Sequence, residues 1–180
     1  SASFAFAALL SNGSMVLWGT RAQCELECVC GICGSDNKRP PIGTVLHLPT
    51  KVDSVCTTIE AFAAKFIDGT VATWGDINRG GDCSSVQPKL KQVDTIYSNE
   101  WAFAAKLRNG SVVTWGSGNF GGDSSSVQDQ LKNVETIYSN GTAFAAKLHD
   151  GSVVTWGDED YGGDSSSVQA QLKQVDTIYS

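Results

Sequence analysis

The chain has 180 residues, a formal charge of −6 at pH 7 and a pI of about 4.8. This length fits one domain or two small ones, and the acidic charge argues against nucleic acid or an anionic membrane surface as a partner. The longest apolar run, residues 4–10, is far shorter than the roughly 20 residues that span a bilayer. We therefore expect a folded domain with no nucleic-acid partner and no direct membrane insertion.

A repeat of 41 residues organises the sequence. Trp-Gly pairs begin at Trp74, Trp115 and Trp156, and a fourth begins at Trp18, 56 residues before Trp74 because of 15 extra residues. Residues 101–139 match residues 142–180 at 29 of 39 positions. Such self-similarity indicates one structural unit used four times.

Each unit contains three short runs rich in β-branched and aromatic residues, which predict strands. The first run lies at 52–57, 93–98, 134–139 and 175–180. The second lies at 5–11, 61–67, 102–108 and 143–149, and the third at 14–18, 70–74, 111–115 and 152–156.

The connections between the runs also repeat. Asn-Gly or Asp-Gly stands between the second and third runs, which favours hairpins with type I′ turns. After the third run come a Gly pair, an Asp and a Ser-x-x-Gln sequence, as at Ser125 and Gln128. This predicts one or two helical turns, begun by the Ser-x-x-Gln capping box or by the preceding Asp, and shortened in the second unit by Pro88.

Three-stranded units repeated every 41 residues predict an all-β fold, a small β-propeller of four three-stranded blades. The chain begins with a second run and ends with a first run, so that pairing of 175–180 with 5–11 would close the ring. We expect one repeat domain over 1–180, with a cysteine-rich insertion at 20–44 in the first long connection.

The pattern around Asp150-Gly151, Val153, Trp156-Gly157, Gly162-Gly163, Leu172, Val175 and Ile178 resembles the regulator of chromosome condensation repeat family, in its three-stranded-blade branch. The repeated sequence AFAAK…GSVVTWG…GGDSSSVQ is also similar to that of repeat proteins of single-celled algae. The resemblance implies a β-propeller whose loops bind proteins, and it does not imply a single activity. Relatives usually have seven blades, so that four repeats form either a small closed ring or an arc of a larger one.

Topology places the turns after the first run and the long connections after the third run on one face. Loops on a rigid scaffold often carry binding residues, and the long connections differ most between the near-identical repeats. The candidate partner-binding residues are Arg79, Trp101, Asn119, Phe120, Asp158, Glu159, Asp160 and Tyr161. The alternative is that these residues are solvated turns. Trp18, Trp74, Trp115 and Trp156 recur in every unit, which favours packing between blades over a ligand cage.

Six cysteines form a separate feature. Cys24, Cys28, Cys30 and Cys33 lie in the insertion. Alignment of the repeats predicts Cys56 at the turn after the first run and Cys83 in the long connection of the same unit. Topology predicts all six on the same face. The cysteines fit disulfides, with Cys56–Cys83 favoured as one bond, or zinc or an iron–sulfur cluster on the four clustered thiols, or unpaired thiols.

These features favour a non-enzymatic scaffold that binds protein partners, since no nucleophile–base pair, phosphate loop or carboxylate dyad can be assembled. The expected role is an accessory subunit of a larger assembly, in an oxidising compartment or a plastid, with no cofactor. The alternative is a metal-binding or redox module that uses the four clustered cysteines.

Overall fold

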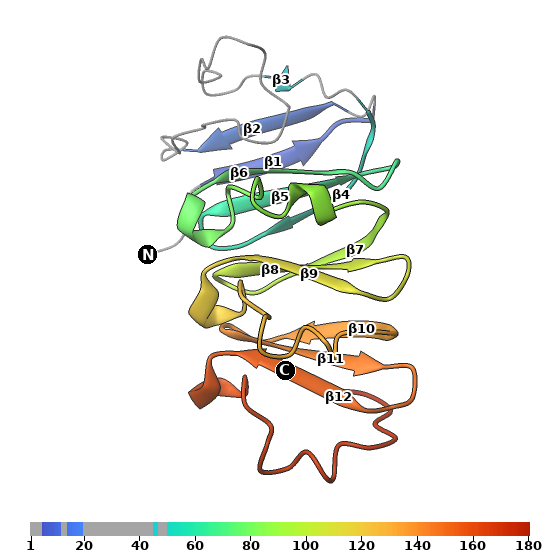
Figure 1. Ribbon diagram of the computed structural model, residues 1–180. Coiled ribbons are helices and arrows are strands. Elements are labelled where there is room, and N and C mark those ends of the chain that lie inside the picture. Colours follow the sequence, from blue (N-terminus) through green and yellow to red (C-terminus); the bar gives the residue numbers. More distant parts are fainter. Residues whose placement is uncertain (1–4, 12–13, 20–44, 47–49) are drawn as a thin grey trace.

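The fold is a row of four antiparallel three-stranded sheets. The computed structural model describes residues 5–11, 14–19, 45–46 and 50–180. The sheets are, in order, β1 (Ala5–Leu9), β2 (Met15–Gly19) and β3 (Val45–Leu46); β4 (Val52–Thr57), β5 (Ala61–Phe66) and β6 (Val71–Gly75); β7 (Val93–Ser98), β8 (Ala102–Leu107) and β9 (Val112–Gly116); and β10 (Val134–Ser139), β11 (Ala143–Leu148) and β12 (Val153–Gly157). They lie one below another from the first sheet to the fourth (Figure 1).

The predicted strands agree closely with the observed ones. The first runs at 52–57, 93–98 and 134–139 coincide with β4, β7 and β10. Strand β3 was not predicted, and it pairs with β2 at the edge of the first sheet. The insertion at 20–44 lies outside the described residues. None of the helices in the described part of the chain is long and apolar enough to cross a bilayer.

The hairpin turns are not of the predicted type I′. In the three described pairs, at 68–69, 109–110 and 150–151, only the glycine has a positive φ, as in Gly110 at 79°. The N–H groups of Gly110 and Leu107 donate to the carbonyls of Leu107 and Ser111, each at 2.9 Å. These bonds define a three-residue connection in which a left-handed glycine ends the turn. The Asn109 side chain accepts the Ser111 N–H at 3.0 Å, so it bonds to its own turn instead of adopting a positive φ.

The segment after each third strand is tied down by side chains. In the third sheet, Asp123 Oδ1 accepts the N–H of Ser125 at 2.9 Å, so the capping residue is the aspartate. Gln128 accepts from Ser124 at 3.0 Å and donates to the Val112 carbonyl at 3.0 Å. The only 3₁₀ helix among the three described serine-rich segments is η2 (Gln87–Lys89), where proline lies in the first turn and is tolerated.

Apolar clusters fill the spaces between the second and third sheets and between the third and fourth. In the first of these clusters the Phe103 ring stacks on Trp115 with centroids 5.2 Å apart. The indole Nε1 of Trp115 donates to the Gly80 carbonyl of the preceding unit at 3.1 Å. The next cluster repeats this arrangement with Phe144, Trp156 and Gly121. Trp115 and Trp156 are buried, each with 3% exposed, and each of them joins two successive units.

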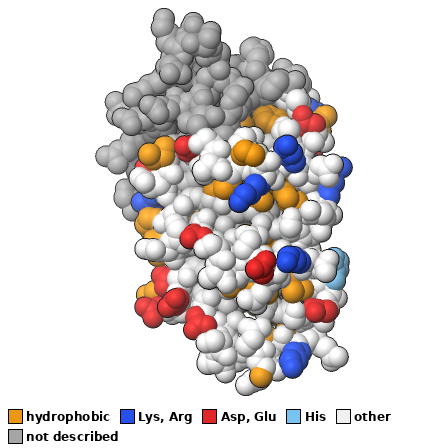
Figure 2. All heavy atoms as spheres, viewed as in Figure 1, with side chains coloured by type: hydrophobic (Ala, Val, Ile, Leu, Met, Phe, Trp, Pro, Cys, Tyr) orange, Lys and Arg blue, Asp and Glu red, His pale blue; other side chains and the backbone are white. Residues whose placement is uncertain are grey.

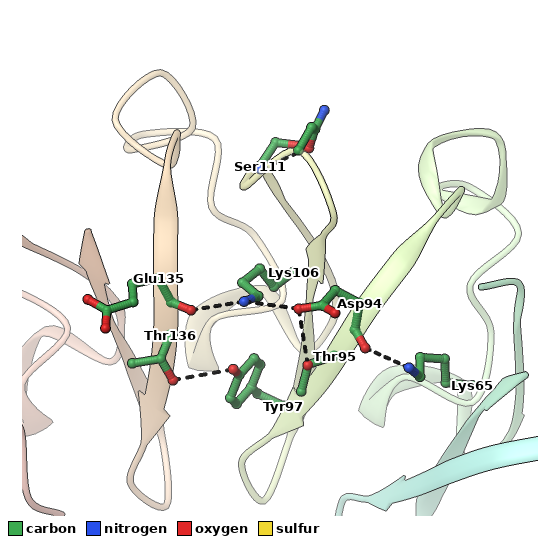
Figure 3. Close-up of polar contacts among 9 residues, drawn as sticks. Lys65, Asp94, Thr95, Tyr97, Lys106, Ser111, Glu135 and Thr136 are labelled. Atoms are coloured by element: carbon green, nitrogen blue, oxygen red, sulfur yellow. Dashed lines mark hydrogen bonds and ion pairs between the residues drawn. The ribbon is translucent and has the colours of Figure 1, made fainter. Parts of the chain in front are cut away.

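A series of lysines links the sheets on their polar side. Lys106 on β8 forms an ion pair with Asp94 at 3.0 Å and donates to the Glu135 carbonyl on β10 at 2.9 Å (Figure 3). Lys65 makes the same two contacts one unit earlier, and Lys147 makes them one unit later. Each lysine therefore joins its own sheet to the first run of the next repeat.

The predicted pairing of 175–180 with the second run at 5–11 is not formed. Among the described residues, 175–180 have no strand partner and β1 pairs with β2 alone. The reason is that the first and fourth sheets lie at opposite ends of the row (Figure 1). The segment still holds the place of a first strand, because Lys147 Nζ donates to the Asp176 carbonyl at 2.8 Å.

Candidate protein-binding face

Three short turns follow the third strands and line one edge of the row. They are the 3₁₀ helices η1 (Ile77–Arg79), η3 (Gly118–Phe120) and η4 (Glu159–Tyr161), which lie on the left in Figure 1. Each ends at a left-handed glycine, for example Gly121 with φ of 95°. We call this edge the loop face and define it as residues 58–60, 76–80, 99–101, 117–121, 140–142 and 158–162.

The turns after the first strands meet these 3₁₀ helices and hold them. Asn99 Nδ2 donates to the Phe120 carbonyl at 2.7 Å, and Asn140 Nδ2 donates to the Tyr161 carbonyl at 2.8 Å. Thr58 makes the equivalent bond to the Arg79 carbonyl at 3.1 Å. The two kinds of connection therefore share one face, as the topology predicted, and the loop face is fixed by side-chain bonds.

A cation–aromatic cluster crosses from the second unit to the third. The Arg79 guanidinium lies over the Trp101 ring, 4.1 Å from its centroid. Trp101 also contacts Phe120, with ring centroids 4.9 Å apart and planes tilted by 33°. Glu60 accepts from Arg79 Nε at 3.2 Å. The cluster of Arg79, Trp101 and Phe120 thus presents a pre-arranged, partly exposed surface of the kind that anchors interfaces.

The same face becomes acidic at the fourth unit. Tyr161 is equivalent to Phe120, but Thr142 replaces Trp101 there, and Tyr161 is 66% exposed. Glu159 and Asp160 are exposed beside it, and Asp158 is partly exposed. Figure 2 shows acidic side chains gathered along the edge beside η4. The candidate residues therefore form a cation–aromatic part and an acidic part with one exposed aromatic ring.

Sequence reasoning missed five residues that contribute to this face. Glu60 pairs with Arg79, and Ile77 is 60% exposed. The tethers at Thr58, Asn99 and Asn140 were missed as well, although the repeat gives a signal for them: a polar residue occupies that position in each described unit. Asn119 is exposed but has no ring contact in the described structure.

The cysteine predictions have mixed outcomes. Cys24, Cys28, Cys30 and Cys33 lie outside the described residues, so their disulfide or metal role stays a prediction that metal analysis and thiol counting would test. Cys56 lies within β4 and not in the turn after it, and Cys56 and Cys83 are not joined by a disulfide, contrary to the expected pairing.

Each of these two thiols bonds to its own acceptor. Cys56 Sγ donates to the Ile96 carbonyl at 3.1 Å, and Cys83 Sγ donates to Gln87 Oε1 at 2.9 Å. Cys83 therefore replaces the serine that bonds the equivalent glutamine in the other units. Burial raises the pKa of the Cys56 thiol, which disfavours the reactive thiolate. No group of His, Cys, Asp or Glu side chains suited to a metal ion occurs in the described ranges.

Comparisons with known proteins identify the fold. No protein-family model and no curated protein matches the chain. Among solved structures, Prp20p of Saccharomyces cerevisiae, studied for its binding properties to Gsp1p and histones, is similar with 22% identity and a TM-score of 0.55, over 86% of this chain and 42% of that chain. The same protein, described as yeast RCC1, was solved bound to Kap60.

Two further structures are similar over comparable lengths. The CRINKLY WD40 ectodomain of the Arabidopsis thaliana receptor kinase ACR4 has 15% identity and a TM-score of 0.54, over 87% of this chain and 49% of that chain. Human WBSCR16 has 16% identity and a TM-score of 0.56, over 87% of this chain and 45% of that chain. The fold is RCC1-like, and the chain spans less than half the length of these neighbours.

Proposed function

We propose that the protein is a non-enzymatic scaffold whose loop face binds a protein partner. The observation that carries the proposal is the cluster of Arg79, Trp101 and Phe120, which is held on tethered turns beside exposed apolar side chains. Interface hot spots are rich in tryptophan, tyrosine and arginine. The solved relative Prp20p, which binds other proteins, supports the proposal by analogy of fold.

The charge of the loop face specifies the partner further. Asp158, Glu159 and Asp160 make one end acidic, and this end favours lysine or arginine on the partner. The rings of Trp101 and Phe120 favour apolar side chains one unit away. The proposed partner surface therefore carries an apolar segment flanked by basic residues.

We extend the proposal to an accessory subunit of a larger assembly, placed in a plastid. The support for this part is the resemblance of the repeats to algal proteins and the absence of a recognisable catalytic constellation in the sequence. His149, the described histidine, is exposed beside the hairpin turn at 150–151 and is not one of the residues of the loop face. Purification from the native source, with mass spectrometry of the proteins that remain bound, would identify the assembly.

The repeat supplies matched variants for a binding test against the partner so identified. Trp101→Thr installs the residue that occupies the equivalent position 142, so we expect the fold to persist. Loss of an interface anchor should weaken binding about tenfold or more, measured by titration calorimetry. His149→Arg installs the equivalent residue of position 108 at the hairpin side and serves as the control. Equal affinities of Trp101→Thr and the unaltered chain would refute the loop face as the binding site.

A further inference from the structure

The described hairpin turns line the edge of the row opposite the loop face (Figure 1). In the third sheet, the N–H of Arg108 donates to the Gln92 carbonyl at 3.0 Å, and the Gly110 carbonyl accepts the N–H of Val134 at 2.9 Å. Each of these hairpin turns is flanked in this way by the segments that lead into two successive first runs. We call this edge the hairpin face and define it as residues 51, 67–70, 89–92, 108–111, 130–133, 149–152 and 171–174.

The two edges of the row carry opposite charge. Six acidic side chains and one arginine lie on the loop face, whereas the hairpin face has two acidic side chains, Asp68 and Asp150. The hairpin face also has six of the ten Lys and Arg side chains of the described residues, all six of them exposed: Lys51, Lys89, Lys91, Arg108, Lys132 and Lys173. In Figure 2 most Lys and Arg side chains lie on the right half of the molecule, opposite the acidic left edge. A chain with a net charge of −6 therefore has a basic surface along one edge.

Most of these cations have no acidic partner of their own. The four described cations outside the hairpin face are all in ion pairs. Among the described residues of the hairpin face, Lys132 is the one cation in an ion pair, with Asp129 at 3.5 Å. Like charges along one edge repel each other, and a surface that serves solubility alone mixes both signs. A row of unpaired cations therefore favours an anionic partner.

The positive charge is most concentrated at the hairpin of the third sheet. Arg108 and Asn109 occupy positions that hold an isoleucine or histidine and an aspartate in the hairpins of the second and fourth sheets. The backbone bonds of this hairpin place it between the segments that carry Lys91 and Lys132. Three cations therefore gather here without the turn carboxylate that the other two hairpins have.

The chemistry of the hairpin face favours the carboxylates of a protein over a nucleic acid. The acidic loop face and the net charge oppose the dense negative charge of a duplex. Binding of single strands relies on aromatic stacking, and the hairpin face contains no Phe, Tyr or Trp.

The repeat also sets a spacing for the partner. Lys91, Lys132 and Lys173 recur once per unit. Packed sheets lie about 10 Å apart, and an extended chain advances about 3.3 Å per residue. A carboxylate at every third residue of an extended segment would therefore meet successive lysines.

We propose that the hairpin face binds an extended acidic segment of a partner protein, with carboxylates at every third residue along Lys91, Lys132 and Lys173. Arg108 adds a contact in the middle of the segment. The proposal does not rest on the loop face. Because the two faces lie on opposite edges, one molecule can hold two partners at once, as a scaffold requires.

The hairpins supply closely matched variants. Asn109→Asp installs the residue of the other two described hairpins, where the aspartate accepts the N–H two residues later at 2.9 Å, as Asn109 does at 3.0 Å. The turn should persist while the central cations gain a negative neighbour, so we expect the affinity for an acidic segment to fall about twofold to fivefold. Asp150→Asn is the reverse change and should raise the affinity by a similar factor.

The experiment is fluorescence anisotropy of a labelled peptide titrated with the full chain. The peptide has glutamate at every third position and about ten residues, which span three units at about 3.3 Å per residue. We expect binding that weakens as sodium chloride is raised from about 0.05 to 0.3 M. A peptide of the same composition with its glutamates consecutive should bind more weakly. Trp101→Thr, which removes a loop-face anchor, is the control and should bind the peptide as the unaltered chain does.

Several results would overturn the proposal. Absence of peptide binding at the lowest salt concentration would do so, and so would an affinity that neither Asn109→Asp nor Asp150→Asn changes. Equal binding of the peptide with consecutive glutamates would contradict the spacing. Tighter binding of a single-stranded oligonucleotide or of anionic lipid vesicles would identify another class of partner. Loss of peptide binding in Trp101→Thr would place the acidic segment on the loop face instead.

Discussion

Two equivalent leucines provide the sharpest test of the sheet-to-sheet packing. Leu131 lies in the cluster between the third and fourth sheets with 0% of its surface exposed. Leu172 occupies the same position one repeat later and is partly exposed. Replacing each by alanine removes the same atoms from the same local sequence, so that the difference reports the effect of the covering sheet.

The burial of the two side chains sets the expected magnitudes. Leu131→Ala opens a cavity in a closed core and should lower the free energy of unfolding by about 3 to 4 kcal/mol. Leu172→Ala removes apolar surface that solvent partly reaches and leaves no closed cavity, so the loss should be about 1 to 2 kcal/mol.

Urea denaturation monitored by tryptophan fluorescence measures both values. Equal losses for the two variants would refute the reasoning, since they would mean that both leucines are covered to the same degree in one copy. A loss below about 1 kcal/mol for Leu131→Ala would contradict a close-packed core between the sheets.

Two further expectations follow from local contacts. Gly121→Ala should cost more stability than Gly162→Ala, because both have φ near 95° but only the first meets a ring, that of Phe144; thermal unfolding of the pair measures the difference, and equal melting temperatures would contradict the clash. The hydrogen bond from Lys106 lowers the pKa of Asp94, so its carboxylate stabilises the fold above its unfolded-state pKa, and this contribution is lost as the pH falls through the folded-state value. Asp94→Asn should therefore lower the melting temperature near pH 7 but not at pH 2, by an amount equivalent to about 0.5 kcal/mol or less for so exposed a pair, and an equal effect at both pH values would point to packing instead of charge.

The sequence predicts local strands well because alternation and turn residues are local signals. The bounds of β7 and β10 coincide with the predicted runs. The turn type was wrong because the Asn109 side chain competes for the Ser111 N–H, which a dipeptide preference does not include. The last run, 175–180, differs from β10 only in having Asp176 where β10 has Glu135, yet it has no strand partner among the described residues. A strand needs hydrogen bonds from a neighbour, and composition alone does not supply one.

The sequence predicted which residues lie on the candidate face but not which of them contact one another. Alignment of the repeats placed Arg79, Trp101 and Phe120 on one side of the molecule. It did not show that Arg79 of one unit reaches Trp101 of the next at 4.1 Å, since that depends on the spacing between sheets. The predicted disulfide between Cys56 and Cys83 was wrong for a related reason. Equivalent positions in a repeat predict the face on which two residues lie, but they do not predict the distance between them.

The side-chain hydrogen bonds join residues that are at most one repeat apart in the sequence, and this affects how the chain folds. The longest of those between described residues joins Ser139 to Ser98, 41 positions apart, which is one repeat. No described sheet depends on a segment far away in the chain, so assembly can start at any unit and spread to adjacent ones. A newly synthesised unit therefore meets the acceptor of its tryptophan already in place as it leaves the ribosome, and loss of structure should begin at the two outermost units and travel inward.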